Sequence, residues 1–250
     1  MKNYLLFRLY GPLASWGDIA VGVNRPSYDH PSKSATMGLL AAALGIRRDE
    51  EEKHRELSES YNFAVAVHSS GNFLRDYHTV QVPSASGIKN QKYILTRKEE
   101  LGVDKDELST ILSSRDYYCD SYYTIVIWGK NAEFPYSLEF IGKKLREPEF
   151  VLYLGRKSCP PSLPFEAKIV SGDNLEEAIK KAEFKCQEFL SLLKIPNQAR
   201  LYWEGDESGL EPVHTITRRD DILSRKRWQF ADRKENYMVL ELGGMKNVHQ

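Results

Sequence analysis

The chain has 250 residues, 41% of them hydrophobic, which is enough for one large domain or two small domains with hydrophobic cores. Its 35 basic and 35 acidic side chains balance, which argues against a protein that coats nucleic acid through overall positive charge but leaves room for a local basic surface. Cys119, Cys159 and Cys186 form neither a zinc pattern nor a disulfide framework, and no segment suits a membrane span or a signal peptide, so we expect a cytoplasmic protein without a membrane partner.

The beginning of the chain predicts a strand followed by a buried helix. Residues 3–10 are apolar and form the strand. Ser32 and Ser34 are suitable N-cap residues for a helix from about residue 35 to residue 44, and Gly45 is a typical C-terminal stop. Because this helix consists mostly of small apolar residues, another backbone can pack closely against it, and we expect it in the core.

The start of this helix is a candidate anion site. It carries unpaired N–H groups and partial positive charge, Lys33 adds a full charge, and Arg25 and His30 lie just upstream. Phosphate is a common ligand of such helix starts. The alternative is an ordinary capped core helix with a solvated Lys33, and the residue pattern alone favours it, because most helix starts bind no ligand.

The middle of the chain predicts further strands and one long excursion. Residues 48–60 suggest a charged helix with a solvated face and no site. Residues 83–114 are first small and polar and then highly charged, and excursions of this length are usually functional or disordered. The remaining elements are expected as strands at 62–70 (with Phe63, Val65 and Val67 on one face), 75–82, 121–129 and 150–155, and as a helix at 135–147 beginning at Pro135.

Together these elements predict an α+β fold. Two helices beside an antiparallel sheet suggest a ferredoxin-like domain over residues 1–155, followed by a smaller C-terminal α+β region over residues 156–250. In that second region we expect a helix over residues 173–194, with Asp173 as cap, Glu176 completing a capping box, and Cys186 in its buried stripe. The expected strands there are 165–170, 199–204, 211–217 and 236–242.

Basic and aromatic residues are the strongest chemical signal. No motif of a metal site, serine hydrolase, P-loop or dinucleotide-binding protein is present, so we expect no metal and no cofactor. Residues 214–234 are rich in arginine and lysine beside two aromatic residues, and Arg156 and Lys157 follow a predicted strand. Arginine binds phosphate bidentately and aromatic rings stack on unpaired bases, so these clusters favour RNA binding over small-molecule chemistry.

A further cluster follows the excursion, at Arg115, Tyr117 and Tyr118. If this segment is extended, Arg115 and Tyr117 point to one side and Tyr118 points to the other. We therefore expect Arg115 and Tyr117 to face RNA and Tyr118 to pack into the domain.

Six motifs in the chain resemble those of one family. They read LxxRLxGPLxSWG, RPxxxxPSKSxxxGLLAAALGI, LRDYHTVQ, RDYYCDxxYT, YLGRKSCPPSLP and RWQFADR, and they extend over nearly the whole chain. In this order they resemble the CasD subunits of CRISPR Cascade complexes of subtype I-E, which belong to the RAMP superfamily. The extra charged residues at 99–112 depart from that pattern.

The resemblance implies a non-catalytic RNA-binding subunit in antiviral defence. Such a subunit holds the 5′ handle of the guide RNA and caps the backbone filament, and residues 79–114 would be its thumb, a hairpin arm. Its implied partners are the guide RNA, CasC-type backbone subunits, a CasA-type large subunit and, through the complex, target DNA. The residues expected to contact RNA, partly from the clusters above and partly from the resemblance, are Trp16, Arg25, Lys33, Ser34, Arg75, His78, Arg115, Tyr117, Arg156, Lys157, Arg225 and Arg227.

An enzyme is the alternative, because a related subunit of another subtype cuts precursor RNA without metal. Such cleavage needs a base near the 2′-OH and a cation for the developing charge. Tyr28, His30, Lys33 and His78 are the candidates for these roles. The resemblance is to the subtype in which a separate subunit cuts, so no catalytic residue is expected.

Overall fold

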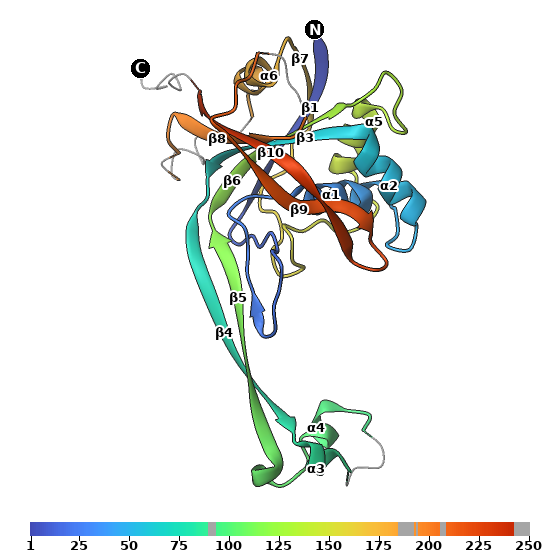
Figure 1. Ribbon diagram of the computed structural model, residues 1–250, viewed down its shortest axis with the longest axis vertical. Helices are drawn as coiled ribbons and strands as arrows, with labels where there is room; N and C mark the ends of the chain where they lie inside the picture. Colours follow the sequence, from blue (N-terminus) through green and yellow to red (C-terminus); the bar gives the residue numbers. More distant parts are fainter. Residues whose placement is uncertain (90–93, 185–192, 194, 206–208, 243–250) are drawn as a thin grey trace. The chain divides into compact units, whose positions relative to one another are not determined.

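The computed structural model describes residues 1–89, 94–184, 193, 195–205 and 209–242. The chain divides into two compact units (Figure 1). The main unit comprises residues 1–16, 28–72 and 118–250, and the smaller unit comprises residues 17–27 and 73–117. The expected boundary at residue 155 does not separate them, because strands from both sides of it pair in one sheet.

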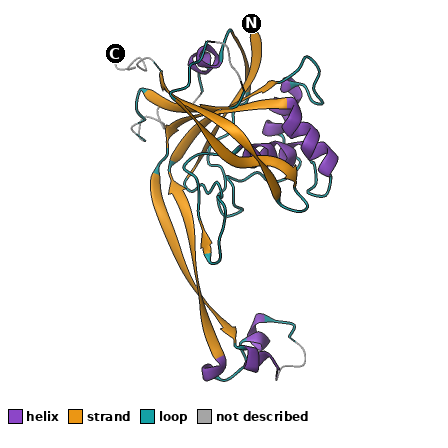
Figure 2. Ribbon diagram, viewed as in Figure 1, coloured by secondary structure: helices purple, strands orange, loops and turns teal. Residues whose placement is uncertain are grey.

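A seven-stranded sheet organises the main unit, with the strand order β7-β1-β6-β3-β8-β10-β9. All neighbouring strands of this sheet pair antiparallel, and strands dominate the unit (Figure 2). The strands are β1 (Lys2–Gly11), β3 (Tyr61–Ser69), β6 (Ser121–Gly129), β7 (Lys168–Gly172), β8 (Gln198–Trp203), β9 (His214–Ser224) and β10 (Gln229–Glu241).

Helices cover both faces of the sheet. The helices of the main unit are α1 (Lys33–Leu44), α2 (Glu51–Ser60), α5 (Leu138–Arg146) and α6 (Leu175–Lys181). On one face α5 lies so close that a Cβ added at Gly142 would be 3.3 Å from Leu5 Cδ1, and α1 packs against α5. On the other face α6 packs on Tyr4 and Leu6. Because both faces are buried, the central strands are apolar at successive residues.

Strand β3 is buried on both of its faces. Phe63, Val65 and Val67 are buried as expected, but Ala64 and Ala66 are equally buried on the opposite face. Small alanines leave room there for α6 and its large neighbours. Continuous apolarity, not alternation, is therefore the pattern of this strand.

The ends of the helices follow their capping residues. Ser32 caps α1 by accepting a hydrogen bond from the Ala35 N–H at 3.1 Å, and Gly45 ends it at a φ of +80°, so both expectations are confirmed. The expected starts of the other two helices are wrong. Ser137 caps α5, so this helix begins at Leu138, three residues after the expected start at Pro135. Asn174, not Asp173, caps α6.

The difference at α6 is a shift of one residue. Asn174 accepts from the Glu177 N–H at 2.9 Å, and the Glu177 carboxylate accepts from the Asp173 N–H at 2.6 Å. The expected partner Glu176 instead pairs with Lys180. Helix α6 ends at Lys181, and Cys186 lies outside the described residues.

Two further expectations change. Residues 150–155 form no strand, because their backbone groups are used elsewhere: the Glu149 and Phe150 N–H groups donate to α1 carbonyls and the Leu154 N–H donates to Cys159. Helix α2 is not wholly solvated, because His54, Leu57 and Ser58 are buried along one side.

The smaller unit holds a three-stranded sheet with the order β2-β5-β4. Its strands are β2 (Asn24–Arg25), β4 (Asn72–Pro83) and β5 (Leu108–Cys119). Between β4 and β5 lie the short helices α3 (Ala85–Lys89) and α4 (Arg97–Glu100) and the 3₁₀ helix η1 (Lys105–Glu107). The expected excursion thus contains ordered elements of its own.

Candidate nucleic-acid interface

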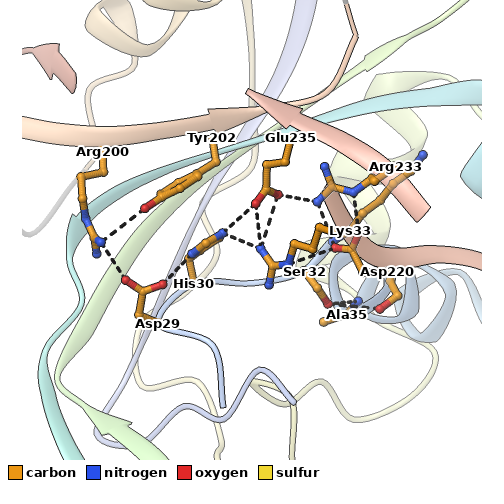
Figure 3. A network of polar contacts seen from close by, with 12 residues as sticks. Asp29, His30, Ser32, Lys33, Ala35, Arg200, Tyr202, Asp220, Arg233 and Glu235 are labelled. Atoms are coloured by element: carbon orange, nitrogen blue, oxygen red, sulfur yellow. Dashed lines mark hydrogen bonds and ion pairs between the residues drawn. The ribbon is translucent and has the colours of Figure 1, made fainter. Parts of the chain in front are cut away.

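The start of α1 binds a carboxylate side chain of the protein itself, at the position expected for a phosphate. The Lys33 N–H donates to the Asp220 carboxylate at 2.8 Å (Figure 3). Asp220 lies on β9 and is buried. A carboxylate at this position satisfies a helix N–H group and meets the positive end of the helix, as a phosphate would.

The side chain of Lys33 is buried as well, with 1% of its surface exposed. Its Nζ lies 2.9 Å from Glu204 Oε2 and 3.2 Å from Asp221 Oδ1. Asp221 also accepts a hydrogen bond from the Ser58 hydroxyl. The charge of Lys33 is therefore neutralised in the interior, and a contact of this residue with phosphate stays a prediction.

His30 joins the loop before α1 to β10 and β8. Its Nδ1 lies 2.7 Å from Asp29 Oδ1, its Nε2 lies 3.3 Å from Glu235 Oε2, and its ring stacks on Tyr202 with 4.0 Å between centroids. Arg200 binds the other oxygen of Asp29 at 2.7 Å. This arrangement fixes the imidazole on both edges and on one face.

Two buried arginines complete the network (Figure 3). Arg233 makes two hydrogen bonds to Asp220, at 2.6 and 2.9 Å, and a further one to Glu235. Arg218 binds Glu235 at 3.1 Å, and its guanidinium lies 3.9 Å from the centre of the Tyr28 ring. The network therefore ties both strands of the β9–β10 hairpin to the loop that leads into α1.

The pKa values reflect this pairing. Burial by itself raises the pKa of Glu235, but the hydrogen bond with His30 and the charges of Arg218 and Arg233 hold this pKa below its usual value. Burial likewise opposes ionisation of Asp29, and its hydrogen bonds with His30 and Arg200 lower its pKa overall. Both groups are therefore carboxylates at neutral pH.

Several expected RNA-binding residues of the main unit are buried. The Trp16 ring is 2% exposed and its Nε1 donates to the Tyr123 hydroxyl at 3.2 Å. Arg225 is 9% exposed and donates to the Ser34 carbonyl, while the Ser34 hydroxyl lies 3.1 Å from that of Ser32. A buried indole offers little surface to a base, and the RNA contact expected of Trp16 stays a prediction.

Three of the expected residues of the main unit keep accessible surface. Arg227 and Lys157 are exposed, and Arg156 is half-buried. Arg227 lies in the turn between β9 and β10, and the other two lie in the loop after residue 155. They remain candidates for a contact with phosphate.

The smaller unit places two of the expected arginines beside each other. Arg25 on β2 is the register partner of Arg115 on β5 in a parallel pair. Both are exposed, and register partners on neighbouring strands point to the same face of a sheet. Backbone carbonyls of Gly22 and Asn24 accept hydrogen bonds from the Arg25 guanidinium and orient it.

The other expected residues of this unit are paired or covered. Arg75 binds the buried Asp116 with two hydrogen bonds, at 2.8 and 3.0 Å, and His78 pairs with Asp76. Tyr117 is only 7% exposed, so its ring is covered, and its contact with RNA stays a prediction. Tyr118 belongs to the main unit, where it is half-buried and pairs through its backbone with Ala14.

The sequence interpretation missed the carboxylates that hold the network. Asp220 and Asp221 lie within the basic segment 214–234 and Glu235 follows it directly, and all three appeared as acids beside arginines and lysines. Strand alternation offered a signal, because residues 218 and 220 of β9 and residues 233 and 235 of β10 share one face as cation and carboxylate.

No helix of the described residues has the length and apolar character needed to cross a membrane.

Comparison with known proteins gives the family. Residues 4–234 match the CRISPR-associated protein family Cas_Cas5. The chain is 34% identical over 172 residues to the CRISPR system Cascade subunit CasD of Escherichia coli (strain K12), which covers 66% of this chain and 70% of that protein. The recognition of the six motifs is thereby confirmed.

Solved structures share the fold. A chain of a CRISPR RNA-guided surveillance complex superposes with a TM-score of 0.63 at 22% identity, covering 96% of this chain and 90% of that one. A crystal structure of a Cas protein gives a TM-score of 0.58 at 25% identity, with 95% of each chain covered. Because the family match extends over nearly all of the main sheet and the whole smaller unit, this chain belongs to the CRISPR-associated Cas_Cas5 family.

Proposed function

We propose that this chain is the RNA-binding subunit of a CRISPR surveillance complex that holds the 5′ handle of the guide RNA. The observation that carries the proposal is the pair Arg25 and Arg115 in the smaller unit. Both side chains are exposed at neighbouring positions on one face of this sheet, so both guanidinium groups can donate to the same anion. A phosphodiester suits this position, because guanidinium groups bind phosphate oxygens through paired N–H donors.

The topology of the main unit supports a ferredoxin-like domain. Along the chain its first elements run β1, α1 with α2, β3, β6, α5 and β7, and in the sheet the four strands lie in the order β7-β1-β6-β3. This is the β-α-β-β-α-β arrangement with antiparallel neighbours. We assign residues 79–114 of the smaller unit as the thumb that contacts RNA and a backbone subunit, and capping of the filament belongs to this assignment.

The proposed subunit does not cut RNA. His30 and Lys33, two of the candidate groups for cleavage, are buried at 4% and 1% exposure and are held by Glu235, Glu204 and Asp221. A general base must reach the proton it removes, and a cation that stabilises charge must reach the reacting phosphate. The arrangement supports a binding role for the chain over the alternative of a metal-independent endoribonuclease.

The relative named CasD is a subunit of Cascade, and the partners we propose follow from that likeness. They are the guide RNA, CasC-type backbone subunits and a CasA-type large subunit, with target DNA reached through the complex. A soluble cytoplasmic complex is the setting that we propose.

Binding of handle RNA tests the proposal directly. The Arg25→Ala, Arg115→Ala and double variants of the full chain are titrated with handle RNA at several salt concentrations. Each single variant is expected to weaken binding by roughly 10-fold to 100-fold and to make the salt dependence shallower, because fewer counterions are released. Melting temperatures equal to that of the parent protein are expected, since both side chains are exposed.

A matched control is Arg55→Ala, which removes one exposed arginine from α2, where it pairs with Glu52. This variant is expected to bind handle RNA like the parent. If Arg55→Ala and Arg115→Ala lost the same affinity for handle RNA, the loss would reflect the change in net charge and not a contact of Arg115. Incubation with repeat RNA in EDTA tests the alternative of a metal-independent endoribonuclease. Formation of a 2′,3′-cyclic phosphate end would establish cleavage and contradict the proposal that the chain binds RNA without cutting it.

A further inference from the structure

An exposed tryptophan stands at the turn between β9 and β10. This turn comprises residues 225–228, and the Trp228 side chain is 58% exposed. The other three tryptophans, Trp16, Trp128 and Trp203, are exposed by 2% or less. An exposed indole ring does not contribute the free energy that its burial would provide, which suggests that the exposure of Trp228 serves a function.

The turn is held in place from several sides. Glu51 on α2 accepts hydrogen bonds from the Ser224 hydroxyl and from the Lys226 N–H at 3.3 Å, and the Ser224 hydroxyl accepts one from the Arg227 N–H at 3.0 Å. Trp228 itself has a φ of +57°, in the left-handed region that bulky residues rarely adopt. Such backbone conformations persist where the surroundings enforce them, and they concentrate at binding sites.

Two arginines flank the Trp228 ring. The guanidinium of Arg48 lies 4.7 Å from the ring centre, and that of Arg225 lies 5.5 Å from the centre of the same ring. Arg48 also donates to the Arg225 carbonyl at 3.2 Å. Gly38 provides the room for Arg225, because a Cβ at that position would lie 2.6 Å from Arg225 Nη2.

The charges around the ring are unbalanced. Within the described part of the chain, no carboxylate forms an ion pair with Arg48 or Arg225. Burial, and to a lesser degree the charge of Arg48, lower the pKa of Arg225 to about 10. Arg227 and Lys226 are exposed beside them and add positive charge, which Glu51 offsets in part.

An aromatic ring between uncompensated cations suits a ligand that is both flat and anionic. Nucleotides combine these properties, because a base stacks on the indole while its phosphate meets a guanidinium. We propose that Trp228, with Arg48 and Arg227, forms a contact for a single-stranded nucleic acid that does not depend on base sequence. This contact rests on the proposed function but lies in the main unit and does not involve Arg25 or Arg115.

Intrinsic fluorescence tests the contact, because Trp228 is the one exposed tryptophan. The full chain is titrated with unstructured RNA and DNA oligonucleotides of equal length that lack the handle sequence. Stacking is expected to quench the fluorescence, and the quenching is expected to vanish in Trp228→Phe while affinity stays within about 2-fold. Trp228→Ala is expected to bind ~5-fold to 100-fold more weakly, the usual cost of losing one stacked base. The arm with the stronger quenching identifies RNA or DNA as the source of the strand.

Further variants keep the outcome clear. Arg48→Ala and Arg227→Ala are expected to reduce affinity and salt dependence, whereas Arg55→Ala is expected to leave both unchanged. If Trp228→Ala binds both oligonucleotides like the parent, or if it only weakens assembly with another subunit, the surface is not a nucleic-acid contact. If Arg115→Ala loses handle RNA in the same preparation, the proposed function stands and only this inference fails. If neither variant changes any binding, both proposals fail.

Discussion

Asp220 accepts a hydrogen bond from the backbone N–H of Lys33 at 2.8 Å, at the helix start where the sequence suggests a phosphate. The carboxylate is itself fixed by two hydrogen bonds from Arg233. A nucleic-acid phosphate would have to displace this buried, paired group from the helix. His30 and Lys33 therefore serve the packing of the hairpin β9–β10, and the RNA contacts that we propose lie at Arg25 and Arg115.

Replacing Lys33 is expected to destabilise the fold without a direct effect on RNA binding. In Lys33→Met the carboxylates of Glu204 and Asp221 lose their buried cation. The free energy of unfolding is expected to fall by about 3 kcal/mol, the lower end of the cost of breaking a buried pair, because Lys130 lies 3.9 Å from Glu204. Urea denaturation measures this change.

The exposed pair of Lys53 with Glu50 supplies the control for Lys33. Lys53→Met is expected to change the free energy of unfolding by less than about 1 kcal/mol. A Lys33→Met protein that unfolds like the parent but loses affinity for handle RNA would restore the phosphate contact.

Acid is expected to weaken the network through Glu235. Its pKa lies below the ordinary value of 4.5 in the folded protein, so its stabilising contribution is complete above pH 4.5 and is lost as the pH falls through the folded pKa. Glu235→Gln is expected to be less stable at pH 7, because Arg218 and Arg233 lose their shared carboxylate, and to lose less stability on acidification. Parallel unfolding curves of both proteins from pH 7 to pH 3 would contradict this role.

His68 is expected to contribute to the pH dependence at milder acidity. Burial lowers its pKa to about 4, from an ordinary value of 6.5, while its Nε2 lies 2.8 Å from the Thr124 hydroxyl. Between pH 6.5 and 4 the unfolded chain binds a proton that the folded chain does not. The free energy of unfolding therefore decreases as the pH is lowered, by up to about 1.4 kcal/mol per pH unit. His68→Asn is expected to remove this slope, and the difference from the parent protein isolates His68 from the other histidines.

Arg75 and Arg115 are expected to differ in their effect on RNA binding. Both are exposed residues of the smaller unit, but Arg75 is neutralised by its two hydrogen bonds to Asp116. Arg75→Ala is therefore expected to leave the salt dependence of handle binding unchanged, while Arg115→Ala makes it shallower by about 0.7 in the logarithmic slope per lost phosphate contact. Equal slopes for the two variants would remove the special role of Arg115.

Assembly is expected to change residues 79–114 more than the main sheet. The helices α3 and α4 are short and largely exposed, so they bury little apolar surface. Hydrogen exchange in this range is expected to be fast in the free chain and slow in the assembled complex. Full protection in the free chain would show that the segment needs no partner to order it.

Much of the local structure was predictable, for local reasons. The strand over residues 3–10 and the helix ended by Gly45 follow from apolar patterning and from backbone preferences of neighbouring residues. The strand expected at 150–155 failed, because Glu149 and Phe150 bond to the end of a helix more than a hundred positions earlier in the chain. Apolar content alone does not say which backbone groups a segment meets.

Six motifs along the amino-acid sequence are enough to identify the family, and residue patterns predict most of the strands and helices. Which charged residues are accessible to a ligand depends on the tertiary structure. Lys33 meets Asp220 across 187 positions and His30 meets Glu235 across 205, while Arg25 and Arg115 come into register at the surface. The physical reason is that a charge is solvated, paired or open to a ligand according to the groups that folding brings within a few ångströms of it, and these groups are distant in the sequence.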